Sequence, residues 1–391
     1  MRAARQASGR LAGDCIASIR SGRCTRNVTF VIAPMITRIS APSLTLFAAG
    51  LIVSTGAAAQ SLAQQQSNVP IVPPAHLQKY FGPAPRDEFT IPLEWLERIA
   101  KSARELPYSG VFVHQSADGS TATSKITHLV DRQGIEREKL ELLDGPLTEI
   151  IRNDQELTCY QPDAKTVRID RRATGRFFPS LITGDAKSIA ENYRVRLGPV
   201  ERIAGFDCQW VVLEPKDAMR YMQKLCAELG TGLLLRARLY NERNQVIEQF
   251  AFTQLDLSRN VARQTLKSRY EKQPGWQMDY AVKSAKDTDT GWAIGNLPAG
   301  FRKVMEMTRT LFGRSQPVSH LVLSDGVLNV SVFVENAPNA NSLPNSISMA
   351  QAEDGPTSFA MRAVPDHQVT VMGEVPLATV QAIADGVSRR R

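Results

Sequence analysis

The chain has 391 residues, with 47 Lys and Arg against 39 Asp and Glu, and a formal net charge of +8. Residues 1–59 hold seven Arg and one Asp, so the rest of the chain has 40 basic and 38 acidic residues and a net charge of +2. That balance argues against nucleic acid as a partner, because nucleic-acid-binding domains carry a strong basic excess. About 330 residues follow position 59, which is enough for two domains of ordinary size.

An apolar run at 44–59 is typical of an export signal. It is shorter than the roughly 20 apolar residues that a membrane-spanning helix needs. Arg38 precedes it, and Ala57-Ala58-Ala59 fits a leader-peptidase site before Gln60. We therefore predict a signal peptide cut between Ala59 and Gln60, and export from the cytoplasm; an uncleaved anchor is the alternative. Residues 1–34 fit a leader badly, so Met35 is the expected true start.

The first predicted elements are an extended or disordered lead-in and one helix. Residues 60–90 are rich in Gln, Pro and Ser, a composition that does not favour a packed core. Leu96, Ile99 and Ala103 then follow at helical spacing, and Pro107 ends the pattern.

From residue 108 the pattern changes to short β-branched and aromatic segments separated by turn sequences. The predicted strands cover 108–115, 124–131, 136–143, 147–153, 156–161 and 165–170. After a partly helical break at 171–193, further strands are predicted at 193–200, 207–215, 219–229, 232–241, 245–257 and 261–268. A long antiparallel sheet with few helices twists and curls, so we expect it to leave a concave apolar face. The predicted fold class is α+β.

A second unit is predicted at 291–388, after a linker at 273–290 that lacks periodicity. Asp325-Gly326 is a strong turn signal inside a hairpin at 319–336. Further strands are predicted at 303–311, 358–364 and 367–374. Residues 337–356 are predicted to be a long exposed loop. Pro376 opens a helix with Leu377, Val380, Ala384 and Val387 on one face, and the three terminal Arg are predicted to be a solvated tail.

Three cysteines follow the leader, so at least one is unpaired within the chain. Cys208 and Cys226 flank one hairpin. A turn with an odd number of residues would place them on one face. A two-residue turn at Asp217-Ala218 would instead pair Gln209 with Cys226 and place the two cysteines on opposite faces. We expect the second arrangement, no bond between the two, and isolated thiols including Cys159.

In this order the parts resemble the RseB/MucB family of periplasmic regulators of the envelope-stress sigma factor. Two blocks carry the resemblance. The first runs from "LPYSGVFV" through "FFPSLI" and "GFDCQWVVLEPKDAMRYMQKL" to "GLLLRARLYNERNQVIEQFAFTQ". The second runs from "LPAGF" through "LVLSDGVLNVSVFVE" to "VTVMGEVPLATVQAIADGV". These motifs are structural rather than catalytic, but their order is specific.

The resemblance implies a larger domain, residues 91–272, similar to the half-barrel of lipoprotein carriers such as LolA. It implies a smaller domain, residues 291–388, that helps to bind the periplasmic part of an anti-sigma factor, RseA or MucA. The bound regulator would shield that partner from a site-one protease such as DegS. Lipopolysaccharide or the acyl chains of a mislocalised lipoprotein would release it. A plain lipid or lipoprotein carrier is the alternative function, and homo-oligomerisation is left open.

Candidate lipid-binding residues are apolar and lie on one strand and in the break of the sheet: Phe112, Phe177, Phe178, Leu181 and Ile182. In one interpretation they line or gate a groove for acyl chains, in which each buried methylene contributes roughly 0.8 kcal/mol. In the other they form a plug that completes the core. A cluster of arginines near the break suits lipid phosphates or an acidic segment, or is a solvated face: Arg168, Arg171, Arg172 and Arg176.

No catalytic residue, cofactor or metal site is predicted. The sequence has no Gly-x-Ser-x-Gly nucleophile motif and no phosphate-binding Gly-rich loop. His114 and His128 lie on neighbouring predicted strands, but two histidines are too few for a zinc site, which needs three or four ligands. We expect both to lie on the strand surface.

Overall fold

The computed structural model describes residues 92–170, 176–258, 261–271, 274–280, 289–311, 316–337, 348–352 and 355–390. The predicted signal peptide and lead-in lie outside this range, as does His76. The described residues belong to one compact unit that extends to Arg391. Among the helices of these residues, none is both long and apolar enough to cross a membrane.

The first helix, α3 (Pro92–Glu105), confirms the prediction from apolar spacing. Its buried stripe includes Trp95, Leu96 and Ile99, which belong to the main core. Pro107 follows its end, because a proline lacks the N–H that a further helical turn requires.

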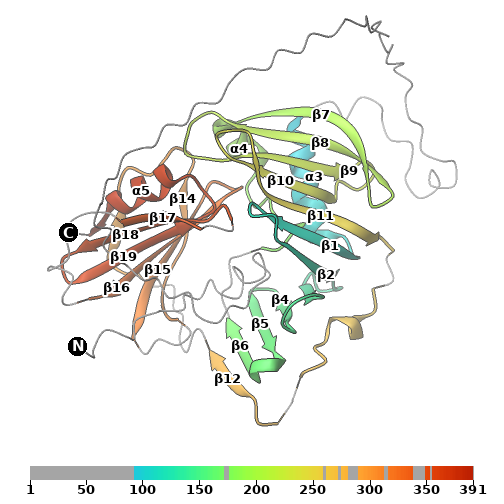
Figure 1. Ribbon diagram of the computed structural model, residues 1–391, viewed down its shortest axis with the longest axis horizontal. Coiled ribbons are helices and arrows are strands. Elements are labelled where there is room, and N and C mark those ends of the chain that lie inside the picture. Colours follow the sequence, from blue (N-terminus) through green and yellow to red (C-terminus); the bar gives the residue numbers. More distant parts are fainter. Residues whose placement is uncertain are drawn as a thin grey trace, which may run out of the picture. The chain divides into compact units, whose positions relative to one another are not determined.

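The first domain is a twelve-stranded sheet in the order β12-β6-β5-β4-β3-β2-β1-β11-β10-β9-β8-β7. Its strands are β1 (Tyr108–Ser116), β2 (Thr121–Val130), β3 (Glu136–Leu142), β4 (Glu149–Asn153), β5 (Glu156–Gln161), β6 (Thr166–Asp170), β7 (Tyr193–Ile203), β8 (Phe206–Pro215), β9 (Met222–Glu228), β10 (Leu234–Tyr240), β11 (Val246–Asp256) and β12 (Gln277–Tyr280). A short helix, α4 (Ala186–Asn192), precedes β7. Figure 1 shows the sheet curving around α3. The predicted large curved sheet with few helices is thus confirmed.

The sheet is antiparallel apart from one pair. Strand β12 pairs with β6 in parallel, with Met278 opposite Val167. Part of the predicted linker is therefore a strand. Residues 261–268, predicted as a strand, instead contain the short 3₁₀ helix η2 (Arg263–Leu266).

Cross-strand register separates the two faces of the first sheet. Val211 lies opposite Leu225, and both are completely buried. Ala237, opposite Leu225 on the next strand, is almost completely buried. We call this the inner face; it also carries Phe112 and Phe250. The alternate residues point to the outer face, because successive side chains of a strand alternate.

The second domain is a six-stranded antiparallel sheet in the order β14-β15-β16-β19-β18-β17. Its strands are β14 (Arg302–Thr310), β15 (Pro317–Ser324), β16 (Asn329–Asn336), β17 (Ser348–Gln351), β18 (Ser358–Val364) and β19 (His367–Gly373). Helix α5 (Leu377–Gly386) packs on β18 and β19, and β13 (Trp292–Ile294) pairs with β20 (Val387–Arg389). The predicted smaller α+β domain is confirmed.

Three details of this domain differ from expectation. Residues 348–351 form the edge strand β17 rather than part of a loop. Leu377 is exposed, whereas Val380, Ala384 and Val387 are buried as predicted. The end of the chain is solvated at Arg389 and Arg390 as predicted, but it is not an unattached tail, because β20 pairs with β13 and Arg390 donates to Asp289 and Glu306.

Candidate functional site

Two of the predicted lipid-binding residues, Phe112 and Phe178, meet in an aromatic cluster on the inner face. The ring centroid of Phe178 lies 5.2 Å from that of Phe112, 5.0 Å from Phe252 and 5.6 Å from Phe250. Phe112 comes from β1, while Phe178 comes from the segment between β6 and α4. Such offset and tilted ring pairs are favourable aromatic contacts.

The segment after β6 is buried in the core rather than open to solvent. Phe177 is 5% exposed, Phe178 2% and Ile182 1%, and Leu181 is partly buried against the same cluster. These side chains therefore complete the core in this structure, as the plug interpretation predicts. Lipid binding by them remains a prediction, and it requires that a ligand displace them.

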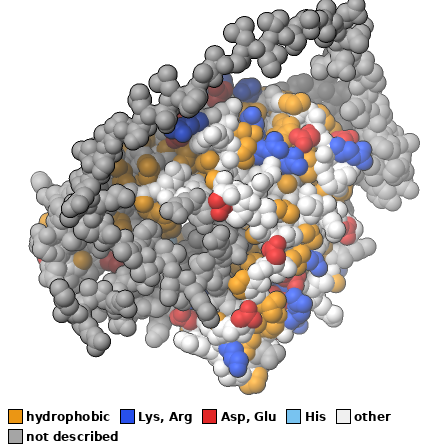
Figure 2. Space-filling view, viewed as in Figure 1, with side chains coloured by type: hydrophobic (Ala, Val, Ile, Leu, Met, Phe, Trp, Pro, Cys, Tyr) orange, Lys and Arg blue, Asp and Glu red, His pale blue; other side chains and the backbone are white. Residues whose placement is uncertain are grey.

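The four predicted arginines do not form one described patch. Arg168 lies on β6 and is half-buried, opposite Cys159. Arg171 and Arg172 lie outside the described residues. Arg176 donates through Nη1 to both carboxylate oxygens of Glu136, at 2.6 Å each. On the face shown in Figure 2, Lys and Arg side chains are mixed with Asp and Glu.

Glu136 is the centre of an ionic group beside the aromatic cluster. His128 Nε2 lies 3.4 Å from Glu136 Oε1, and the Tyr108 ring stacks on His128 at 4.8 Å. Burial raises the pKa of Glu136, but hydrogen bonds from His128 and Arg176 outweigh it and lower the pKa to about 2. This carboxylate is therefore ionised at neutral pH.

A second, more deeply buried ion pair adjoins the first. Arg152 Nε donates to Glu138 Oε2 at 3.3 Å, and both side chains are almost completely buried. Burial raises the pKa of Glu138, and the charge of Arg152 partly opposes this. The Arg152 guanidinium also lies 5.3 Å from the Phe177 ring centroid. The segment that carries Phe177 and Phe178 thus has a charged border formed by Arg152 and Arg176, each of which is paired with a glutamate.

Sequence reasoning missed a polar seam between the two sheet domains. Asp325 lies in the β15–β16 turn, and its Oδ2 accepts from Arg220 Nε at 2.7 Å and from the Tyr193 hydroxyl at 2.9 Å. Burial, followed by the charge of Asp325, raises the pKa of Tyr193 well above its usual value. Arg220 also donates to Asp217 and to the Ala299 carbonyl. The turn signal Asp325-Gly326 was visible in the sequence, but its partners were not.

The same turn contacts the segment that carries Phe178. The amides of Thr183 and Gly184 both donate to the Gly326 carbonyl at 2.9 Å. A Cβ on Gly184 would stand 2.6 Å from the Gly326 Cα, a distance that real Cβ atoms do not show. Glycine is therefore required at both positions for the two chains to approach so closely.

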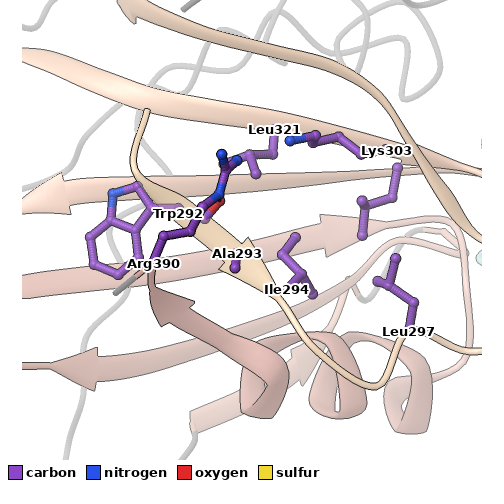
Figure 3. A pocket seen from close by; sticks show the side chains of 8 residues that line it. Trp292, Ala293, Ile294, Leu297, Lys303, Leu321 and Arg390 are labelled. Atoms are coloured by element: carbon purple, nitrogen blue, oxygen red, sulfur yellow. The ribbon is translucent and has the colours of Figure 1, made fainter. Parts of the chain in front are cut away.

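The second domain contains a cavity of about 290 Å³ (Figure 3). Its lining is mainly apolar, with two basic side chains: Trp292, Ala293, Ile294, Leu297, Lys303, Leu321, Leu323 and Arg390. Lys303 and Arg390 are both paired with Glu306. The cavity has the volume of a small ligand pocket, but both of its charged side chains are already paired with Glu306.

The predicted separation of Cys208 and Cys226 is wrong, because the two form a disulfide. Cys226 lies opposite Trp210 rather than Gln209, so both cysteines point to the outer face and their Cα atoms are 5.4 Å apart. The strands are joined by a longer connection than the assumed two-residue turn, and a shift of one residue reverses every side chain. Cys159 is buried and not in a disulfide.

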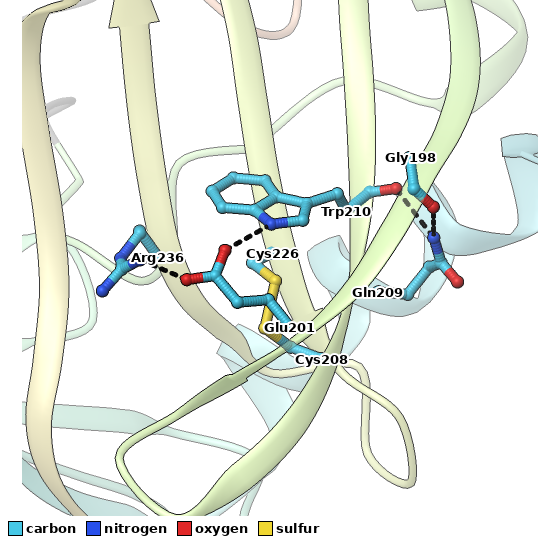
Figure 4. The surroundings of a disulfide bond; sticks show 7 residues. All are labelled: Gly198, Glu201, Cys208, Gln209, Trp210, Cys226 and Arg236. Carbon is cyan, nitrogen blue, oxygen red and sulfur yellow. Dashed lines mark hydrogen bonds and ion pairs between the residues drawn. A yellow bond between two sulfur atoms is a disulfide. The ribbon is translucent and has the colours of Figure 1, made fainter. Parts of the chain in front are cut away.

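Polar contacts surround this disulfide on the outer face (Figure 4). Glu201 accepts from Trp210 Nε1 and from Arg236 Nη1, at 2.7 Å in each case. Gly198 lies against Trp210, and a Cβ there would stand 3.0 Å from the Trp210 Cβ. These residues cover a disulfide whose cysteines are completely buried.

The two predicted surface histidines are buried instead. His114 is 4% exposed and lies 3.0 Å from Glu248, while His128 is 0% exposed. They do not approach each other, since His114 lies opposite Ala122 and His128 opposite Tyr108, six residues apart along the pair. The described part of the chain contains no group of three or more metal-ligating side chains.

Taken together, a twelve-stranded curved sheet, a second sheet domain and a buried polar seam define a two-domain protein of the class built on a large curved sheet. Residues 92–270 match the MucB/RseB N-terminal domain, and residues 286–388 match the MucB/RseB C-terminal domain. The chain therefore belongs to the MucB/RseB family, as the sequence motifs predict.

Similar proteins support the assignment. The sigma factor AlgU regulatory protein MucB of Pseudomonas aeruginosa is 31% identical over 299 residues, which cover 74% of this chain and 89% of that protein. The sigma-E factor regulatory protein RseB of Escherichia coli is 23% identical over 248 residues, covering 63% of this chain and 74% of that protein. MucB in the solved Pseudomonas aeruginosa MucA/MucB complex matches with a TM-score of 0.60 and 28% identity, covering 77% of this chain and 99% of that one.

Proposed function

We propose that this chain is a periplasmic negative regulator of an envelope-stress sigma factor. It binds the periplasmic part of a membrane-bound anti-sigma factor and shields that partner from a site-one protease. Lipopolysaccharide or the acyl chains of a mislocalised lipoprotein release the partner. The protein acts by binding and catalyses no reaction.

One observation carries this proposal. The chain shares both domains with MucB over 99% of the MucB chain that was solved together with MucA. Relatives of the same family are named as sigma factor regulatory proteins. Because both domains are present here, we expect this chain to bind a MucA-like partner as well.

The proposed release requires a difference in affinity between two forms. A lipid changes the complex only if it binds the free form more tightly than the partner-bound form. The aromatic cluster around Phe178 is apolar and suits an acyl chain, and the guanidinium groups of its charged border suit the phosphates of a lipid head.

The test uses the protein purified from the periplasm and the periplasmic part of the anti-sigma factor from the same organism. We expect the two to co-elute and the regulator to slow cleavage by the site-one protease. Adding lipopolysaccharide should restore cleavage. If no complex forms while lipid co-purifies with the chain, the lipid-carrier alternative replaces this function.

A further inference from the structure

The segment that bears Phe178, residues 176–184, is held in an unusual way. We call it the plug segment. Two of its backbone hydrogen bonds are local, from Ser180 to the Phe177 carbonyl at 2.7 Å and from Leu181 to the Pro179 carbonyl at 2.9 Å. Among the described residues, no backbone hydrogen bond joins it to the first-domain sheet. The position of the plug segment therefore does not depend on backbone hydrogen bonds to the sheet.

Side chains hold the plug segment on the inner face instead. The ring of Phe178 lies among three rings that belong to strands β1 and β11, those of Phe112, Phe250 and Phe252. These three come from paired strands, so they remain in place if the plug segment leaves. Its departure would open an apolar hollow lined by aromatic rings.

The plug segment has an ionic attachment at its start. Arg176 binds Glu136 with two short contacts, and Arg152 stands over Phe177. A phosphate or carboxylate would compete with Glu136 for Arg176, because guanidinium groups bind such anions by paired hydrogen bonds. The hollow and its border therefore suit a ligand with an aliphatic tail and an anionic head.

The end of the plug segment is attached to the other domain. Thr183 and Gly184 donate to the Gly326 carbonyl, and the neighbouring Asp325 is held by Arg220 and Tyr193. Withdrawal of residues 183–184 would therefore remove two hydrogen bonds from the β15–β16 turn of the second domain.

We propose that residues 176–184 are a displaceable plug that passes lipid occupancy from the first domain to the second. An amphiphile with an aliphatic tail and an anionic head takes the place of Phe177 and Phe178, and its entry withdraws Thr183 and Gly184 from Gly326. This mechanism deepens the proposed lipid response and rests on it for the biological source of the ligand. We call the form in which residues 176–184 have left the inner face the plug-out form. Because the ligand binds only this form, its apparent affinity scales with the fraction of molecules that adopt it.

The first test needs no anti-sigma factor. Dodecyl phosphate is added to the purified protein below its micelle concentration, and hydrogen exchange is followed by mass spectrometry in fragments covering 177–186 and 324–328. We expect exchange at Thr183 and Gly184 to accelerate at least tenfold. Inorganic phosphate and dodecyltrimethylammonium should leave it unchanged, since one lacks the tail and the other the anionic head. Unchanged exchange at saturating dodecyl phosphate overturns the proposal.

The second test uses a matched pair of glycine variants. Gly184→Ala places a Cβ against Gly326 and should favour the plug-out form, whereas Gly355→Ala meets nothing within 4 Å. We expect Gly184→Ala to bind dodecyl phosphate at least tenfold more tightly than wild type, and Gly355→Ala to bind as wild type does. Equal affinities of all three proteins overturn the proposal.

A third variant keeps the proposal testable if Gly184→Ala does not fold. Glu136→Gln weakens the attachment of Arg176 without changing the size of the side chain, and it should also tighten binding of dodecyl phosphate. If Gly184→Ala fails to fold, unchanged affinity of Glu136→Gln overturns the proposal by itself. Since none of these measurements contains the anti-sigma factor, their failure is distinct from a failure of partner binding.

Discussion

Arg220 and Asp325 form a completely buried ion pair that joins the two sheet domains, with 2.7 Å between Nε and Oδ2. Removing one partner of a buried pair leaves the other charge without compensation, which costs about 3–5 kcal/mol. We expect Arg220→Leu to lower the free energy of unfolding by this amount in urea denaturation. The control is Arg194→Leu, because Arg194 is 70% exposed and pairs loosely with Glu214; its effect should stay within about 0.5 kcal/mol. Equal effects of both variants would show that the pair does not stabilise the seam.

The disulfide should contribute measurably to stability. Cys208 and Cys226 are 18 positions apart, and closing a loop of that length stabilises a protein by about 3 kcal/mol in the chain-entropy model. We expect the double variant Cys208→Ala/Cys226→Ala to unfold at lower urea concentration by that free energy. Dithiothreitol should lower the stability of wild type and leave the double variant unchanged. A wild type insensitive to reductant, in which Cys208 and Cys226 both titrate as thiols after unfolding, would contradict the bond.

The disulfide also shows where sequence reasoning reaches its limit. Strand positions follow from local patterns, so β5 and the helix that begins at Pro92 were found directly. The faces of Cys208 and Cys226 depend on the number of residues in the connection between their strands. The connection spans Lys216–Tyr221 and carries no two-residue turn. An error of one residue in register reverses the face of every side chain.

The candidate site was predictable only in its apolar part. Phe177 and Phe178 stand out as an aromatic pair in a break between strands. The seam was not predictable, because Tyr193 and Asp325 are 132 positions apart and only the folded chain brings them together. In the same way, the arginine cluster suits lipid phosphates, an acidic segment or a solvated face, and the sequence does not show that Arg176 binds Glu136, 40 positions away.

The aromatic cluster decides which substitution of Phe178 can test its role in the lipid response. Phe178→Asp would bury a charge among three rings and destabilise the fold itself, so it cannot separate lipid response from partner binding. Phe178→Leu keeps an apolar side chain and should cost less than about 1.5–3 kcal/mol, since only part of the buried area is lost. We expect this variant to retain partner binding in a pull-down and to alter the concentration of lipopolysaccharide needed for release. Unchanged release would exclude Phe178 from the lipid response.

His320 should make stability depend on pH. It is buried between Arg309 and Ser331, and burial followed by the charge of Arg309 lowers its pKa to about 3. The unfolded state, with a pKa of about 6.5, therefore takes up a proton first as the pH falls. Stability from this group is complete above pH 6.5 and is lost progressively toward pH 3.

The measurement compares wild type with His320→Gln by urea denaturation at pH 7 and pH 5. Wild type should lose about 2 kcal/mol more than the variant over this interval, because one pKa unit corresponds to about 1.4 kcal/mol. The comparison removes the contribution of the other titrating groups, which both proteins share. Parallel profiles would mean that His320 is not held neutral by its surroundings.

A larger side chain that fills the cavity of the second domain should make the protein more stable. Ala293 lies on β13, opposite Ser388, and lines the cavity of about 290 Å³ (Figure 3). Ala293→Val adds two methyl groups to that space and suits a strand, because β-branched residues favour extended backbone. We expect the free energy of unfolding to rise by about 0.5–2 kcal/mol, as cavity-filling substitutions commonly do. Ala350→Val, on the exposed strand β17, is the matched control and should change it by less than about 0.5 kcal/mol. A lower stability of Ala293→Val would show that the Cβ of this residue does not point into free space.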